Sequence, residues 1–338
     1  MFLLVKDTRF APFLLVFLVQ LYRIVTEDQE FLNARKKHMS ILGLSMLGVL
    51  LFRQDGVYVL LLTWLAVFVF CKRKRKLAGS LAIGVFLFST LYTQVLLPAF
   101  QVVPTNPREM LSIPFQQTAR YLLYAGDEVT EEEAEAIAAI LDYDHLAELY
   151  NPNLSDPVKA TFDKDSGMEE LMAYFRVWFQ MFRKHPDIYV EATFNNVYGY
   201  FYPAGYSTEL FSYDKSSQHM EKINEILEEF GTDFHYPEAL DSVRSTMEDM
   251  RERIFQLPVL SALNMSACYI WTLILMFFYC LKGKRKDVIL IMCPLLVVLL
   301  VCIAGPIYGW YFRYMYSIAV CLPGVVALAW SNKRKCEE

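Results

Sequence analysis

The first residues whose types suggest chemistry are Arg53 and Asp55, which lie in a turn between two apolar runs. Each run, 39–51 and 57–70, gives about 20 Å of helix, which is short for a hydrocarbon core of about 30 Å. The turn is therefore expected to lie deep, and Gly56 suits a tight turn. Ionisable side chains at membrane depth normally face a protein interior or a wet cavity, so both are candidate functional residues. The alternative is an ordinary loop at the membrane surface.

A second guanidinium, that of Arg313, lies within a stretch of Gly, Pro and aromatic residues at 305–316. Such a composition is typical of a membrane interface. Planar bidentate donors suit phosphate or carboxylate, and a polyprenyl (pyro)phosphate presents its head at this depth. We therefore predict that Arg53 and Arg313 contact a lipid phosphate, with Asp55 as part of the same pocket.

Three further polar residues, Gln116, Gln117 and Arg120, follow Pro114, which suits the first turn of a helix. Spacings of three and four residues put side chains on one helical face, so the two amides and the guanidinium are expected close together. Next to a membrane they make a plausible pocket wall. A solvated helix face explains the same pattern, and this alternative stays open.

The elements that must position these residues are membrane helices. The chain has 338 residues, of which 55% are hydrophobic and 15% aromatic, and this is too apolar for an ordinary soluble protein. The sequence predicts an all-α polytopic membrane protein with about seven transmembrane helices, two of them short. The predicted spans are 10–25, 40–52, 57–71, 77–97, 260–281, 288–304 and 314–330.

Charge divides the chain into parts that are expected to face different compartments. Residues 101–258 hold 29 acidic and 12 basic residues, a net charge of −17, whereas the rest of the chain carries +12. Short basic runs at 72–76, 282–286 and 333–335 adjoin predicted spans, which indicates a cytoplasmic location for all three. Because these runs adjoin apolar spans, topology explains them better than nucleic-acid binding, and no nucleic-acid partner is expected.

Three regions follow: membrane helices at 1–97, an acidic extracytoplasmic domain at 98–259, and membrane helices with a cytoplasmic tail at 260–338. The acidic domain is expected to be helical. Thr130 and Glu133 form a capping-box pattern at the start of a helix that is expected to reach residue 149. Pro186 separates expected helices at 167–184 and 187–200, and two more are expected at 217–230 and 238–256.

No cofactor or metal site is predicted. None of the seven cysteines lies in the acidic domain, so a disulfide framework is excluded there. No Cys/His spacing indicates a metal site.

The start of the chain is expected to lie outside the cell. Counting spans backward from the basic run at 72–76 places Lys6 and Arg9 on the outer side, with no cleavable signal peptide before them. Missing upstream spans would explain this arrangement. The alternative is a signal anchor at 10–25 with Lys6 and Arg9 inside.

Several short motifs resemble known membrane enzymes. Residues 51–58 (LFRQDGVY) are similar to the R-x-x-G turn between two short spans of GT-C-superfamily glycosyltransferases, and residues 310–314 (WYFRY) to the R-Y before their last span. Residues 113–120 (IPFQQTAR) and 185–203 resemble a family of Gram-positive bacterial multi-pass membrane proteins grouped with that superfamily. The resemblance covers most of the chain, but each motif is short.

The resemblance implies transfer of a sugar from a polyprenyl-(pyro)phosphate donor to a cell-envelope acceptor at the outer face of the plasma membrane. It implies a catalytic aspartate in a first outer loop that residues 1–338 do not contain, so no catalytic residue is assigned and this chain alone is expected to be inactive. Arg53 and Arg313 would contact the donor phosphate, while Gln116, Gln117 and Arg120 would shape the pocket. Such transfer needs a base for the acceptor and cationic groups for the departing lipid phosphate.

Two other functions remain open. A flippase or transporter of lipid-linked sugars is typically built from inverted repeats or carries several charged residues inside its spans, and neither pattern is visible here. A non-catalytic scaffold of the cell envelope fits the acidic domain as well as an enzyme does.

Overall fold

The structure, a computed structural model, forms only helices in the part of the chain that it describes, which confirms the expected all-helical class for that part. The predicted helix at 217–230 lies outside the described residues except for residue 228, and the basic run at 333–335 lies outside them entirely. The described residues are 6–26, 33–102, 107–203, 228, 231, 238–257, 260–305 and 312–331.

Each of the seven predicted apolar runs lies on a helix. Four helical stretches are long and apolar enough to cross a membrane: Lys6–Thr26, Lys72–Ala99, Lys286–Ala304 and Phe312–Trp330. The other three are shorter or begin with basic residues, so the full set of seven spans stays a prediction. These helices are α1 (Lys6–Thr26), α3 (Arg35–Phe52), α4 (Gly56–Phe70), α5 (Arg75–Leu91, continued to Ala99 by Tyr92–Leu96 and by α6, Leu97–Ala99), α15 (Ser266–Lys282), α16 (Lys286–Ala304) and α17 (Phe312–Trp330).

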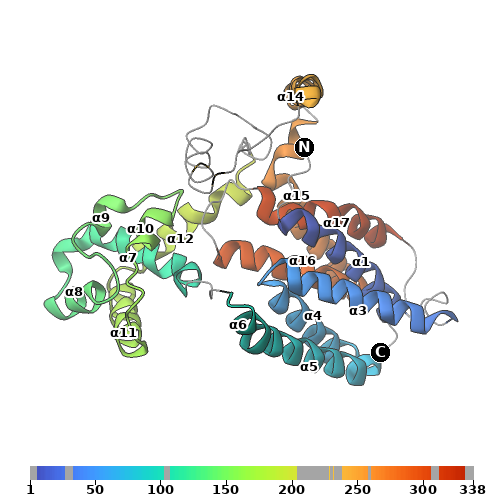
Figure 1. Ribbon diagram of the computed structural model, residues 1–338, viewed down its shortest axis with the longest axis horizontal. Helices are drawn as coiled ribbons and strands as arrows, with labels where there is room; N and C mark the ends of the chain where they lie inside the picture. Colours follow the sequence, from blue (N-terminus) through green and yellow to red (C-terminus); the bar gives the residue numbers. More distant parts are fainter. Residues whose placement is uncertain are drawn as a thin grey trace.

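The seven helices form a bundle with one apolar core (Figure 1). Helix α1 packs against α3 and α17, and α16 packs against both α17 and α4. In contrast, α5 packs chiefly on α4 and buries only Ala78 and Val85. An apolar helix with so little buried surface belongs at the lipid-facing edge of a bundle.

Ion pairs and hydrogen bonds fix which helix ends lie together. Asp7 at the start of α1 pairs with Arg53 at the end of α3, and Arg53 also reaches the start of α17 at Tyr314. At the other end of the bundle Arg285, just before α16, donates to the backbone at the end of α17. The described basic runs at 72–76 and 282–286 therefore lie at one end, and Lys6 lies at the opposite end.

This arrangement leads to a topology prediction. A cysteine placed at Lys284 is expected to react with a maleimide only after the cytoplasmic side is exposed, whereas a cysteine at Glu132 is expected to react in intact cells, because basic runs stay inside. The measurement is labelling with an impermeant maleimide before and after permeabilisation. Reaction of the cysteine at 132 only after permeabilisation would reverse the proposed orientation.

A second group of helices, here called the helical domain, has its own core and lies beside the bundle (Figure 1). Large aromatic side chains dominate this core, including Phe115, Tyr174 and Tyr189. The helices are α7 (Ser112–Ala125), α8 (Glu131–Ala138), α9 (Leu146–Leu149), α10 (Asp156–Ala160), α11 (Met168–Lys184) and α12 (Pro186–Phe201).

The local signals at the ends of these helices behave mostly as predicted. Thr130 and Glu133 form the capping box at the start of α8, and Pro186 begins α12 directly after α11 ends. The expectation that the helix from Thr130 continues to residue 149 is wrong, because α8 ends at Ala138. The chain turns there so that Ile140 and Leu141 enter the core of the helical domain.

Helix α12 connects the two cores. Its first half places Ile188 and Tyr189 in the core of the helical domain, and its second half places Val197 and Tyr200 in the core of the bundle. It accordingly packs on both α7 and α15. One continuous helix therefore contributes side chains to both the core of the helical domain and the core of the bundle.

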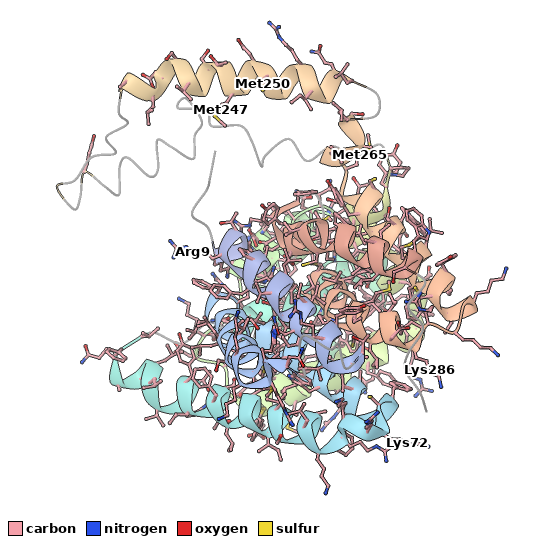
Figure 2. The ribbon with its side chains drawn as sticks, turned by 90° about the vertical axis from the view of Figure 1, so that its right-hand side faces the viewer. Arg9, Lys72, Met247, Met250, Met265 and Lys286 are labelled. Atoms are coloured by element: carbon pink, nitrogen blue, oxygen red, sulfur yellow. The ribbon has the colours of Figure 1, made fainter. Side chains whose placement is uncertain are left out.

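Helix α14 (Asp241–Gln256) lies apart from the bundle, as Figure 2 shows. It fulfils the prediction of a helix at 238–256, with a short 3-10 turn at Glu238–Leu240 before it. Val243, Met247 and Met250 are all exposed and lie on one face by their spacing. The helix is thus amphipathic.

Candidate functional site

The predicted turn exists, and its two charged residues pair with each other. The Gly56 N–H donates to the Arg53 carbonyl at 3.0 Å, which closes the turn between α3 and α4. The Arg53 guanidinium donates from Nε and Nη2 to the two carboxylate oxygens of Asp55, both at 2.8 Å. A planar fork of this kind matches a carboxylate in two places, which fixes both side chains.

A residue that the sequence did not single out completes this network. Asp7, at the start of α1, accepts from Arg53 Nη1 at 3.0 Å, and only 3% of Asp7 and 7% of Arg53 is exposed. The Arg53 guanidinium also lies 5.2 Å from the centre of the Phe10 ring. The only signal in the sequence was a lone acidic residue between Lys6 and Arg9. Two carboxylates thus share one guanidinium in this network.

The same network reaches the start of α17. Arg53 Nη1 donates to the Tyr314 carbonyl at 3.1 Å, and the Cys302 thiol approaches that carbonyl at 3.5 Å. The Arg53 turn and the segment that bears Arg313 therefore meet.

Helix α12 contributes a tyrosine beside this network. Tyr200 is 1% exposed, and it interacts electrostatically with Cys302, Tyr314 and Arg53. Burial, reinforced by the neighbouring Cys302 and Tyr314, raises the Tyr200 pKa well above its ordinary value, so the hydroxyl is neutral. One turn earlier, the buried Asn196 amide has no hydrogen-bond partner among the described residues.

Arg313 lies on the first turn of α17 and is partly exposed. Its Nη2 donates to the Tyr314 hydroxyl at 3.0 Å, and its guanidinium lies 4.9 Å from the centre of the Tyr314 ring. A helix N-terminus favours an anion through its aligned backbone dipoles. Arg313 and this helix end together form a positively polarised edge at the end of the bundle.

The opposite end of the bundle repeats the arginine fork. Arg285 donates to the two carboxylate oxygens of Asp287 at 3.1 and 3.0 Å, with the same two-residue spacing as Arg53 and Asp55. It also donates to the carbonyls of Leu328, Ala329 and Ser331, which lie at the end of α17. The last carbonyls of a helix lack the usual backbone donor four residues on, and Arg285 supplies donors to them; the Leu328 carbonyl also accepts from Ser331. Arg–Asp forks thus hold both ends of α17.

The two glutamines of the predicted pocket wall have their partners inside the helical domain. Gln116 Nε2 donates to the carbonyls of Asn151 and Leu154, at 3.0 and 2.9 Å. Gln117 Nε2 donates to the Thr193 hydroxyl at 2.9 Å, and its Oε1 accepts from Trp178. Both side chains are buried, so they join α7 to neighbouring segments of the domain.

Arg120 is also held within the helical domain. Its Nη2 pairs with the Glu191 carboxylate at 2.6 Å, and its guanidinium lies 4.4 Å from the centre of the Tyr124 ring. The neighbouring Tyr121 is part of the same core, and burial, with a smaller effect of Glu133, raises its pKa to about 12. The polar face of α7 is thus a packing face, and its described contacts do not connect it with the Arg53 network.

Within the described residues, no cluster of three or more His, Cys, Asp or Glu side chains could hold a metal ion. The candidate functional site is the network of Asp7, Arg53 and Asp55 with its neighbours on α12 and α17. It is an ion network inside a helical bundle, with one partly exposed arginine beside it.

In the part of the chain that the structure describes, these features define an all-helical architecture with four helices long and apolar enough to cross a membrane and a buried ion network at one end of the bundle. The chain belongs to the family of unknown function DUF6020, whose model matches residues 1–338. No curated protein and no solved structure matched the chain.

Proposed function

We propose that this chain is part of a membrane glycosyltransferase that moves a sugar from a polyprenyl-(pyro)phosphate donor to a cell-envelope acceptor. The observation that supports the proposal is the hydrogen bond from Arg53 to the Tyr314 carbonyl, because it brings together the two arginine-bearing segments that the GT-C resemblance singled out. The donor phosphate would bind at this end of the bundle, at the outer face of the plasma membrane. Residues 98–259 would lie on the same outer side.

The two arginines have different roles in this proposal. The donors of Arg53 already point at Asp7, Asp55 and a carbonyl, so Arg53 positions the turn and the start of α17. Arg313 is partly exposed on the first turn of α17, where the helix dipole adds to its charge, so it makes the phosphate contact. No described residue is assigned as the catalytic base.

The second candidate function is a non-catalytic membrane scaffold. The repeated Arg–Asp fork favours it, because Arg285 and Asp287 hold the other end of α17 through contacts with the helix backbone. If the protein is a scaffold, the Arg53 network only stabilises the structure, and Arg313 does not bind a specific lipid.

Binding of a polyprenyl phosphate to Arg313 variants separates these functions. We expect Arg313→Gln to weaken binding by about 10- to 100-fold, since a hydrogen bond to a charged group contributes about 1.5–3 kcal/mol. Arg313→Lys keeps the charge but loses the fork, so an intermediate loss is expected. The measurement is binding of a polyprenyl phosphate to the whole chain in lipid nanodiscs, with thermal unfolding recorded in parallel.

Arg285→Gln is the matched control, because Arg285 contacts the other end of the same helix. It is expected to lower thermal stability and to reduce polyprenyl-phosphate binding less than Arg313→Gln does. Unchanged polyprenyl-phosphate binding in both Arg313 variants would reject the proposal that Arg313 binds the donor phosphate and would favour the scaffold function.

A further inference from the structure

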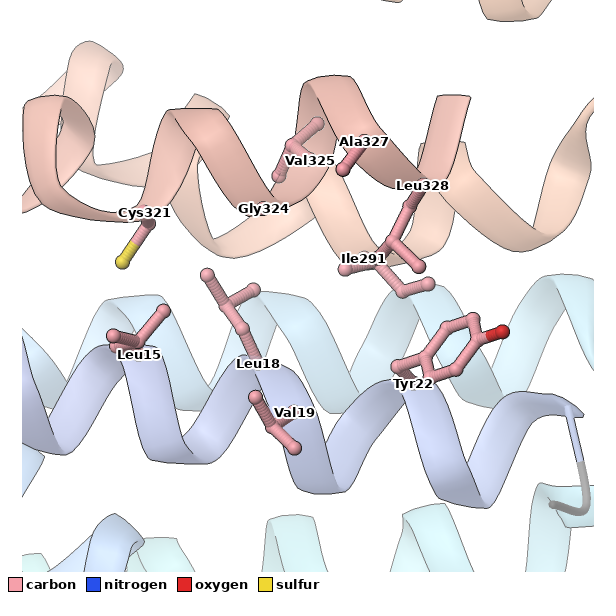
Figure 3. Close-up of a pocket in the computed structure, with 10 residues that line it drawn as sticks. All are labelled: Leu15, Leu18, Val19, Tyr22, Ile291, Cys321, Gly324, Val325, Ala327 and Leu328. Carbon is pink, nitrogen blue, oxygen red and sulfur yellow. The ribbon is translucent and has the colours of Figure 1, made fainter. Parts of the chain in front are cut away.

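A groove lies between α1 and α17. It has a volume of about 290 Å³ and is floored by Ile291 of α16. Figure 3 shows Leu15 and Cys321 at one end of it and Tyr22 and Leu328 at the other.

Gly324 of α17 lines the groove and has no side chain to fill it. A Cβ atom added at Gly324 would meet no atom within 4 Å, so the space beside it is open. Ala327, one turn further on, is also small. On α1 the groove is lined by Leu15, Leu18, Val19 and Tyr22 (Figure 3).

The occupant of this groove must be a hydrocarbon chain. The lining is apolar except for the Tyr22 hydroxyl and the Cys321 thiol, so a water molecule there would lack the two to four polar partners that it needs. Both flanking helices are among the four long enough to cross a membrane. Val19, Gly324 and Ala327 are exposed, so the groove is open at the surface of the bundle.

The charges at one end of the groove identify the headgroup. Tyr22 lies at that end and interacts electrostatically with Arg285, which also donates to the carbonyl of the lining residue Leu328 at 3.3 Å. Beside Arg285 the exposed lysines Lys284 and Lys286 add positive charge that Asp287 does not balance. Basic residues at a membrane surface attract anionic lipid headgroups.

We propose that this groove is a binding site for an anionic phospholipid, with one acyl chain along α1 and α17 and the headgroup at Lys284 and Lys286. Tyr22 then lies at the boundary between chain and headgroup, where tyrosine is favoured. The site is at the end of the bundle opposite Arg313, and it does not depend on the proposed sugar transfer.

Filling the groove tests the proposal. Gly324→Leu places a side chain in open space on a helix, so it is expected to leave the fold intact and to lower retention of phosphatidylglycerol by roughly tenfold or more, because the acyl chain loses its apolar contact. Gly84→Leu is the matched control, since Gly84 on α5 also has no atom within 4 Å of an added Cβ. The measurement is native mass spectrometry of the whole chain titrated with phosphatidylglycerol or phosphatidylcholine.

The headgroup is tested separately. Lys284→Gln with Lys286→Gln is expected to reduce the preference for phosphatidylglycerol over phosphatidylcholine by roughly 30-fold, since each basic residue strengthens attraction to anionic lipid by about fivefold.

Equal phosphatidylglycerol retention in Gly324→Leu and Gly84→Leu would show that the groove does not bind the acyl chain. Equal retention of phosphatidylglycerol and phosphatidylcholine by the unmodified chain would show that the site does not select an anionic headgroup. Stronger retention of a polyprenyl phosphate that Gly324→Leu abolishes would also overturn the phospholipid site. Arg313→Gln is expected to leave phosphatidylglycerol retention unchanged, so this proposal and the donor site can fail independently.

Discussion

Replacing Arg53 with methionine is expected to destabilise the bundle by about 3–5 kcal/mol, because it leaves the buried carboxylate of Asp7 without its partner. The same change frees Asp55 and removes the hydrogen bond to Tyr314, so α1, α4 and α17 lose a common anchor. The measurement is equilibrium unfolding of the whole chain in mixed detergent micelles.

Further variants separate the buried charge from the lost contacts. Asp7→Asn keeps the shape of the side chain and leaves Arg53 paired with Asp55, so a smaller loss of about 1–3 kcal/mol is expected. Combining Arg53→Met with Asp7→Leu is expected to recover part of the loss, since no unpaired charge then remains at Asp7. Equal stability of Arg53→Met and the unmodified chain would show that the network does not hold the bundle together.

Gly56→Ala is expected to cost about 3 kcal/mol, at the upper end for overpacking. An added Cβ would lie 2.2 Å from the carbonyl oxygen of Val49 and 2.9 Å from its carbonyl carbon. Both are backbone atoms of α3, so the turn itself must shift. The Arg53–Asp55 fork lies in that turn and would shift with it.

Gly43→Ala is the control for this prediction. Gly43 is on α3, and an added Cβ would meet no atom within 4 Å, so the change is expected to stabilise the helix by about 0.5–1 kcal/mol. Equilibrium unfolding of both variants, with α-helix content followed by circular dichroism, gives the comparison. A Gly56→Ala protein as stable as Gly43→Ala would show that the α3–α4 turn tolerates a wider geometry.

The helices were largely predictable from the sequence because their signals are local. Apolar runs, the capping box at Thr130 and the proline at Pro186 each act within a few residues, and each marks a helix or a helix end that the structure contains. The early end of α8 at Ala138 was not predictable in this way. It depends on Ile140 and Leu141 turning into a core built from other parts of the chain.

The candidate site was only partly predictable. The Arg53–Asp55 pair follows from residues two positions apart, but the partner Asp7 comes from another helix, and no local pattern specifies that contact. The sequence predicted that Gln116, Gln117 and Arg120 lie close together on one helix. It did not predict which segments of the chain contact them. A polar helix face looks the same in sequence whether it borders a pocket or, as here, donates to carbonyls and carboxylates of adjacent segments.

The forks at both ends of α17 also bear on how this protein adapts to bilayers of different thickness. A helix pinned at Tyr314 and again at Leu328–Ser331 cannot slide along the membrane normal or tilt by itself without breaking charged hydrogen bonds. Mismatch between a hydrophobic length and the bilayer is usually relieved by tilt or by local lipid deformation. Of the four candidate spans among the described residues, the one that contains α5 is the least buried, so we expect it to tilt most easily. We therefore expect α17 to keep its position in the bundle when the bilayer thickness changes, and α5 to change its tilt.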